Sequence, residues 1–208
     1  MSGVAGYGAS IKKSGTSTGF TDESMSNTAG NTFQIDDTAK QVFDRDTTLT
    51  FYEDDVEIDA SDVSSIDYLY GKVTFATGKT GAITVDGNYM PMSNVAGARE
   101  VTLNRTAQLL DDTDLGNAGY HTKEYGLQDV AVTVGRFDDI QYAFTDIIEN
   151  RTACVIEIAP NATKSYRGWF KVESSGLTLD INALLDESIA FTLDGDTTTG
   201  KTFSRSDA

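Results

Sequence analysis

Hydrophobic residues alternate with polar residues along much of this sequence, and the alternation is sharpest in the C-terminal half. Between Asp129 and Phe137, three valines (Val130, Val132 and Val134) fall at every second position. A period of two is typical of a β-strand with one buried face. The stretch therefore predicts a strand that presents its valines to a core.

One helix is predicted directly after this strand. Asp138 and Asp139 suit the N-cap and the first helical turn. Apolar residues then recur with the spacing of a buried helical stripe, at Ile140, Ala143, Phe144, Ile147 and Ile148. The pattern predicts an α-helix over about residues 139–149.

Other segments alternate in the same way and predict further short strands. After the helix, these strands cover residues 154–158, 169–172, 177–181 and 189–193. Before it, they cover residues 48–52, 66–75 with a turn at Gly71, 83–89 with a second possible hairpin, and 99–105. Tyr125 and Leu127 extend the alternation just ahead of the valine strand. Many short strands and one helix predict a mainly β fold, a β-sandwich or barrel with one packed helix.

Both ends of the chain are predicted to be flexible. Residues 1–33 are rich in Gly, Ser, Thr and Asn, with a short strand-like piece from Val4 to Ile11. A segment with so little apolar area is expected to be an extended arm that becomes ordered on a partner. Residues 195–208 are expected to form a flexible tail. The whole of residues 1–208 is long enough for one domain with a sizeable core.

The composition limits the partners of the protein. The 208 residues contain 32 Asp and Glu against 16 Lys and Arg, a net charge of −16. Such a chain repels phosphate backbones and anionic lipid, so neither tight DNA binding nor membrane binding is expected. The N-terminus lacks a basic segment followed by an apolar run, and no stretch approaches the ~20 apolar residues of a membrane span. Synthesis in the cytoplasm without signal-directed export is the expectation.

Motifs for catalysis are weak. Gly195 to Thr202 matches the phosphate-binding loop pattern, but only six residues follow, too few for the helix whose N-terminus such a loop needs. His121 is the single histidine and lies in a polar loop, so a surface position is expected rather than a catalytic one. Cys154 is in phase with Ile156 and is expected to be a core residue. We therefore predict that the protein is not an enzyme and uses no cofactor.

Acidic runs occur at three places. They are residues 53–59, the loop with Asp111, Asp112 and Asp114, and the pair Asp194 and Asp196. None has the complete ligand spacing of a calcium loop, so solvated turns are favoured over cation sites, and no metal is predicted. The many carboxylates always offer pairs, but nothing in their placement singles out a pair for glycoside hydrolysis.

Two stretches resemble a known family. The acidic loop and following strand, Asp111 to Val134, and the closing run, Gly168 to Gly195, resemble the corresponding parts of tail tube (major tail) proteins of long-tailed, non-contractile bacteriophages. The second stretch has a strand, a Gly turn, a strand, a loop and a final strand with Ile189, Phe191 and Leu193 at alternate positions. The likeness covers about 100 residues, mainly in the C-terminal half.

The resemblance implies a structural virion protein of the tail, made in the host cytoplasm. It implies self-assembly into a hexameric ring, with rings stacked into a tube around a tape-measure protein and ended by a tail terminator. Genome DNA would pass through this tube during ejection without tight binding. An acidic lumen would let DNA slide, because each lysine or arginine there would add an adhesive contact. Adaptation to high salt, or simple solubility, is the alternative explanation of the charge.

Residues for the assembly interface follow from this interpretation. They are Val4, Tyr7 and Ile11 of the arm, Asp111, Asp112, Asp114 and Tyr120 of the acidic loop, and Val130, Val132 and Val134 of the supporting strand.

Alternative functions remain open at this stage. The chain could be another tube-fold component, such as a terminator or the inner tube of a contractile tail. From a different class, it could be a carbohydrate-binding β-sandwich that uses Trp169 as a sugar platform or subunit contact.

Overall fold

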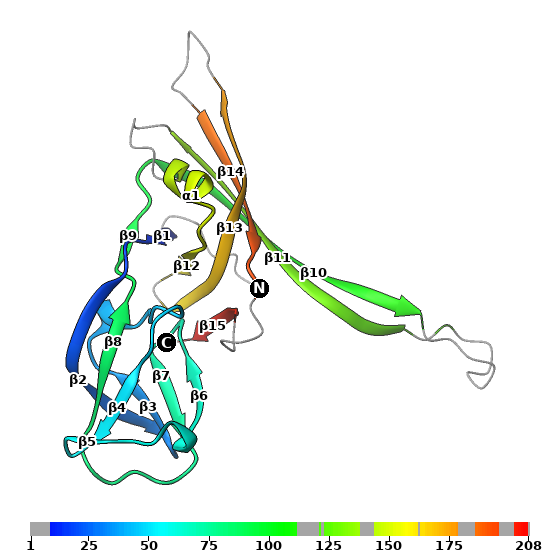
Figure 1. Cartoon of the computed structure of the whole chain (residues 1–208). Helices are drawn as coiled ribbons and strands as arrows, with labels where there is room; N and C mark the ends of the chain where they lie inside the picture. The colour runs from blue at the N-terminus through cyan, green and yellow to red at the C-terminus, as the bar shows by residue number, and fades with distance from the viewer. Residues whose placement is uncertain are drawn as a thin grey trace. The chain divides into compact units, whose positions relative to one another are not determined.

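The structure is a computed structural model that describes residues 9–111, 121, 123–137, 144–161, 163–178, 186–195 and 202–207 (Figure 1). Strands dominate the described chain, which confirms the prediction of a mainly β fold. The chain divides into two compact units. Unit 1 comprises Met1–Val95, Cys154–Trp169 and Asp194–Ala208, and unit 2 comprises Ala96–Ala153 and Phe170–Leu193. That residues 1–208 form a single domain stays a prediction.

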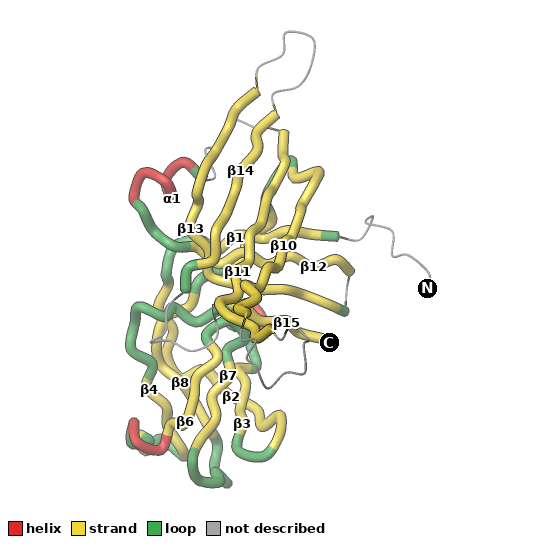
Figure 2. Tube along the Cα trace, turned by 90° about the vertical axis from the view of Figure 1, so that its right-hand side faces the viewer, coloured by secondary structure: helices red, strands yellow, loops and turns green. Residues whose placement is uncertain are grey.

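A seven-stranded antiparallel sheet forms most of the described part of unit 1 (Figure 2). The strands follow the order β5-β4-β8-β2-β3-β7-β6. Their bounds are β2 (Thr18–Ala29), β3 (Thr32–Ile35), β4 (Thr50–Glu53), β5 (Val56–Glu57), β6 (Val63–Asp67), β7 (Lys72–Phe75) and β8 (Ile83–Tyr89). Short 3₁₀ helices cover Thr38–Lys40 and Ala60–Asp62.

The core of this sheet is drawn from one continuous stretch of the chain, residues 20–85. Its buried hydrophobic cluster consists of Phe20, Met25, Phe33, Ile35, Phe43, Phe51, Ile58, Val73, Phe75, Ile83 and Val85. Phe75 contacts both Phe33 and Phe51, with ring centroids 5.8 Å apart in each pair. The predicted hairpin at residues 66–75 is confirmed as β6 and β7, with Gly71 at a φ of +60° between them. The predicted strand at 83–89 is confirmed, but it lies between β2 and β4 rather than in a hairpin of its own.

The seven-stranded sheet is inserted between two strands that pair with each other. β1 (Ser10–Ser14) precedes it and β9 (Met92–Asn94) follows it, and Ser14 lies opposite Met92 in the antiparallel β1–β9 pair. The Gly15 N–H donates to the Pro91 carbonyl oxygen at 2.7 Å, which closes the base of the insertion. The chain therefore leaves and re-enters this part of unit 1 at one point.

The rest of unit 1 is built on β1. β12 (Cys154–Asn161) pairs with β1, and the first part of β13 (Lys164–Thr178) pairs with β15 (Phe203–Asp207). Glu157 on β12 is 4% exposed and forms ion pairs with Lys12 at 2.9 Å and Arg167 at 2.5 Å. The Arg167 guanidinium also lies 4.8 Å from the ring centroid of Tyr70. A buried carboxylate is thus held between two cations of neighbouring strands.

Unit 2 is a twisted antiparallel sheet with one short helix. Its strands, β10 (Ala98–Asp111), β11 (Lys123–Phe137), β14 (Asp186–Leu193) and the second part of β13, follow the order β10-β11-β14-β13. The helix α1 covers Thr145–Asn150. On the core face, Val132, Val134, Ile189 and Phe191 are all fully buried, and Phe144 contacts Phe191 with ring centroids 5.2 Å apart. The predicted alternation of the valine strand is confirmed.

Arg136 continues this alternation into the core of unit 2. Its side chain is 1% exposed, and its Nε donates to Glu187 of β14 at 2.6 Å. The Ser175 hydroxyl donates to the other oxygen of Glu187 at 2.8 Å. A buried arginine is tolerated here because its carboxylate partner is itself held by a hydrogen bond.

Three predictions about the ends and the helix need correction. The arm predicted at residues 1–33 is wrong for its described part, because β1, β2 and β3 occupy residues 10–14, 18–29 and 32–35. The flexible tail predicted at 195–208 is wrong for residues 203–207, which form β15 and pair with β13. The helix predicted at about 139–149 is confirmed only over Thr145–Asn150, and residues 138–143 lie outside the described chain.

Candidate assembly surface

The two longest strands of unit 2 extend beyond the sheet as a two-stranded ribbon (Figure 1). β14 pairs with β11 from Ala131 to Phe137, whereas β11 pairs with β10 as far out as Lys123 opposite Asp111. We call residues 105–111 and 123–130 the ribbon. Among the described residues, no further strand pairs with either outer edge of the ribbon. Its backbone edges are therefore available for pairing with another chain.

Large apolar side chains of the ribbon are exposed to solvent. The exposed fractions are 82% for Leu127, 78% for Tyr125, 52% for Leu109 and 48% for Leu110. Tyr125 lies directly opposite Leu109 in the β10–β11 pair, and Leu127 is two residues further along the same strand. Directly paired residues share a face, so Leu109 and Tyr125 form one exposed apolar pair, and the exposed Leu127 lies beside it in the register shift between Tyr125 and Gln128. A contiguous exposed apolar face on a water-soluble surface is typical of an interaction site.

On the opposite face of the ribbon, a leucine side chain packs over a glycine. A Cβ atom at Gly126 would lie 3.2 Å from Cγ of Leu110, so the Leu110 side chain covers the glycine. A register shift between Ala107 and Leu109 bends the pair at the same place. Such a bulge changes which face successive side chains occupy. Leu110 pairs with Glu124, next to the Leu109–Tyr125 pair, and therefore lies on the face opposite Tyr125.

The charges of the ribbon are mixed rather than acidic. Lys123 lies opposite Asp111, and Arg105 lies opposite Val130. Asp129 accepts a hydrogen bond from the Val130 N–H at 2.7 Å. With Glu124 included, the ribbon has three acidic residues against two basic ones, a smaller acidic excess than the two to one of the whole chain. A second copy of the chain meets little electrostatic repulsion there.

The structure gives different positions to the residues predicted for assembly. Asp111 ends β10 with 57% of its side chain exposed, and Val130, Val132 and Val134 are buried in unit 2, so they support the ribbon rather than form its surface. Ile11 is 5% exposed and belongs to the core of unit 1. Five predicted residues lie outside the described chain, namely Val4, Tyr7, Asp112, Asp114 and Tyr120. An interface role for all of these residues stays a prediction.

The surface residues of the ribbon were not among the predicted interface residues. Tyr125 and Leu127 continue the predicted strand pattern, and no local pattern distinguishes Leu109 and Leu110. The sequence shows only that the strand pattern continues through Tyr125 and Leu127, and where β14 stops covering it depends on long-range pairing.

His121 is exposed, whereas Trp169 is buried. His121 is 80% exposed, which confirms the predicted surface position, and its Nδ1 lies 3.7 Å from Asp111. Trp169 is 3% exposed, and the Arg45 guanidinium lies 4.4 Å from its ring centroid. A buried indole offers no platform to a sugar ring, so the predictions that Trp169 binds carbohydrate or contacts another subunit are wrong.

The acidic run at residues 53–59 forms a tight turn between β4 and β5. Asp54 and Asp55 both have positive φ, at 50° and 65°, as a two-residue hairpin turn requires. The backbone N–H groups of Gly81 and Thr80 donate to Glu53 and lower the pKa of that carboxyl group. Lys79 forms ion pairs with Asp62 and Glu53. These carboxylates stabilise a loop, and in the described ranges no three His, Cys, Asp or Glu residues form a group that could hold a metal ion.

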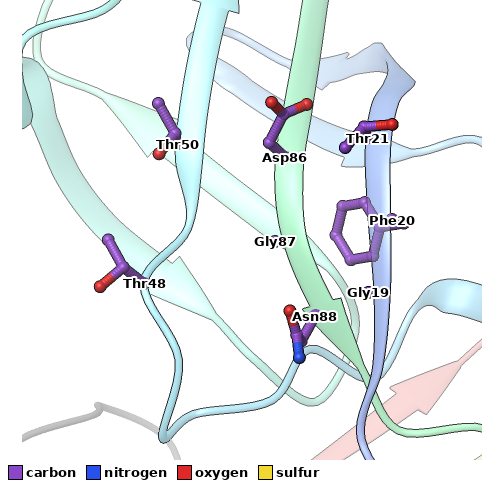
Figure 3. Close-up of a pocket in the computed structure, with 8 residues that line it drawn as sticks. All are labelled: Gly19, Phe20, Thr21, Thr48, Thr50, Asp86, Gly87 and Asn88. Atoms are coloured by element: carbon purple, nitrogen blue, oxygen red, sulfur yellow. The ribbon is translucent and has the colours of Figure 1, made fainter.

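A polar hollow of about 430 Å³ lies over three adjacent strands of unit 1 (Figure 3). Thr50 of β4 lies opposite Asp86 of β8, and Thr21 of β2 lies on the other side of Asp86. One Asp86 oxygen already accepts the Asp22 N–H at 2.7 Å. Hydroxyl groups around a single carboxylate, with no adjacent base or cation in the lining, do not form a recognisable catalytic set.

Cys154 is 3% exposed, which confirms the predicted core position. Burial raises the pKa of its thiol to about 12. At pH 8 only about one molecule in 10,000 then carries a thiolate, the species that attacks alkylating reagents. We expect the native protein to resist iodoacetamide at pH 8 and to react fully in denaturant, as measured by mass spectrometry of the intact chain. Rapid labelling of the native protein would contradict the buried position.

No helix in the described part of the chain has both the length and the apolar character needed to span a membrane.

Comparisons with known proteins give matches among solved structures only. No family model and no curated protein matches the sequence. The chain is similar to one in the virion of the native gene transfer agent (GTA) particle, with 15% identity and a TM-score of 0.46, over 56% of this chain and 88% of that one. It is also similar to a chain in the tail of the empty GTA particle, refined with C6 symmetry, with 14% identity and a TM-score of 0.47, over 57% of this chain and 87% of that one.

Proposed function

We propose that this protein is a structural virion component that self-assembles into the tube of a viral tail. The observation that carries the proposal is the ribbon, a long projecting strand pair whose outer edges are unpaired in the described chain and whose Leu109, Tyr125 and Leu127 side chains are exposed. Leaving such a surface in water is unfavourable, and pairing with another copy removes both the free edges and the exposed apolar area.

The sequence resemblance to tail tube proteins supports the same function. Within its two stretches, the strands at Lys123–Phe137, Lys164–Thr178 and Asp186–Leu193 are present, and the last two pair with each other. The Gly turn predicted at residues 174–176 is wrong, because β13 continues through it as one strand. In this proposal the copies form a hexameric ring and the rings stack. The resulting tube surrounds a tape-measure protein, ends at a tail terminator, and passes the genome without binding it tightly.

The acidic composition supports passage of DNA. A wall rich in carboxylates repels phosphates and offers few of the counterion-releasing contacts that hold nucleic acid. The described carboxylates form structural ion pairs and turns rather than a catalytic set, which supports a structural role over an enzymatic one.

Electron microscopy of the purified protein and of intact particles tests the proposal. We expect hollow cylinders built from repeated copies of this chain, and a copy number per particle far above that of a terminator. Concentrated protein that remains monomeric, together with particles whose tube contains none of this chain, would contradict the proposed function.

A further inference from the structure

The seven-stranded sheet of unit 1 curls so that strands from its two ends line one hollow. In the strand order, β5 and β4 lie at one end and β6 lies at the other. A hollow of about 290 Å³ is nevertheless lined by both ends, through Thr48, Leu49, Thr50, Phe51, Glu57, Ile58, Ala60, Val63 and Ile66. We call this hollow the seam. It is the place where the curled sheet fails to close on itself.

The seam opens onto the core of the sheet. Phe51 and Ile58 are core residues with 2% and 9% exposure. Leu49, Val63 and Ile66 pack against the same core but are only partly buried. Among the described strands, β5 and β6 each have a partner on one side only. The seam therefore combines apolar side chains that remain partly in water with two edge strands.

We propose that the seam is the docking site for the ribbon of a second copy of this chain. The inference rests on the proposed function and adds to it the surface that receives the ribbon. The ribbon carries the two most exposed large apolar side chains of the described residues, Leu127 and Tyr125. Aromatic and aliphatic side chains that enter an apolar pocket on the partner supply most of the energy of many interfaces. The volume of the seam suits a few such side chains rather than a folded domain.

Charge complementarity favours the same occupant. Glu57 lines the seam and is exposed, as are its neighbours Asp55 and Asp59. On the face of the Leu109–Tyr125 pair, the ribbon carries two basic residues, Lys123 and Arg105, against one acidic residue, Asp111. When the apolar face of the ribbon enters the seam, its basic residues come near the acidic rim. Complementary charges at a rim set the partner and the register of an interface.

The contact joins two different surfaces, so each copy gives one ribbon and receives another. Such a head-to-tail contact generates a closed ring if the rotation closes, and a filament if it does not. The seam contact therefore accounts for continued addition of copies, as a tube requires.

Disulfide cross-linking of the full-length protein tests the seam contact. All variants carry Cys154→Ser, and the test variant adds Leu127→Cys and Ala60→Cys, one on the ribbon and one exposed in the seam. Mild oxidation after assembly is expected to give a ladder of covalent oligomers on a non-reducing gel. A matched control combines Leu127→Cys with Thr28→Cys, an exposed residue of β2 that does not line the seam.

The outcomes separate the seam from the tube. Tubes that form normally but give no more cross-linking than the control pair would overturn the seam contact and leave the proposed function standing. A disulfide formed within one chain would also overturn the seam contact. Such a bond would leave the protein at the position of the monomer on a non-reducing denaturing gel. Covalent oligomers without tubes would support the seam contact and contradict the tube.

Discussion

The double variant Tyr125→Asp with Leu127→Asp is expected to abolish tube formation while leaving the monomer folded. Both side chains are more than three-quarters exposed, at 78% and 82%, so the fold loses little packing. Surface substitutions of this kind change the free energy of unfolding by about 0.5 kcal/mol or less. Buried in an interface, each anchor contributes about 2 kcal/mol, and two of them change an association constant by at least about 100-fold.

Light scattering and electron microscopy over a range of protein concentrations measure this effect. The expected result is a rise in the critical concentration of at least about 100-fold, with an unchanged melting temperature. Leu177→Asp is the matched control, because Leu177 is an apolar residue of unit 2 with 52% exposure that lies outside the ribbon. Equal loss of assembly in the control would show that general acidity, not the ribbon, governs association. Normal tubes from the double variant would contradict an assembly role for the ribbon.

Glu157→Ala is expected to cause the largest loss of stability. Glu157 is 4% exposed and pairs with both Lys12 and Arg167, whose side chains are 38% and 12% exposed. Removing the carboxylate leaves the buried Arg167 guanidinium without its ion pair. Breaking a buried pair in this way costs about 3–5 kcal/mol. Urea denaturation followed by tryptophan fluorescence measures the free energy of unfolding.

The exposed carboxylate Glu124 supplies the control for this substitution. Glu124→Ala is the same chemical change on the ribbon surface and is expected to alter the free energy of unfolding by about 0.5 kcal/mol or less. A loss for Glu157→Ala no greater than that of the control would contradict a stabilising role for the buried pair.

The stability contributed by Glu157 also depends on pH. Burial, the largest single influence, raises the pKa of this carboxyl group, but Arg167 and Lys12 together outweigh it and lower the pKa below its usual value. A lowered folded-state pKa contributes stability that is complete above the unfolded-state value of about 4.3 and is lost as the pH falls through the folded-state value. The wild-type protein should therefore lose more stability than Glu157→Ala on acidification below about pH 4.3.

Alternation allowed the strands of unit 2 to be predicted because one face of each is consistently buried. In β11, Val130, Val132 and Val134 are buried while Thr133 is exposed. The same rule fails in β2, where only Phe20 and Met25 are buried and they lie five residues apart. A register shift between Phe20 and Glu23, with Asp22 at a φ of +55°, moves the buried face from one set of positions to the other. Because the bulge interrupts the hydrophobic alternation of β2, the sequence pattern predicts a polar arm instead of a strand.

The candidate site could be predicted only in part, because exposure depends on the lengths of neighbouring strands. Tyr125 and Leu127 continue the strand pattern of β11, and nothing local shows that β14 stops pairing at Ala131. Pairing of residues far apart in the sequence decides whether an alternating strand is covered. Trp169 illustrates the converse, since it is buried and one of the side chains over its ring, Arg45, is distant in sequence.

The paired strands at the base of the inserted sheet make that sheet exchangeable. Because Ser14 and Met92 face each other across one antiparallel pair, a foreign domain whose two termini lie side by side could take the place of residues 16–90 without moving the strands that bracket it. A lineage carrying this protein could thus acquire or swap a whole module by recombination at two sites. The same junction offers a point at which an enzyme or an antigen could be grafted.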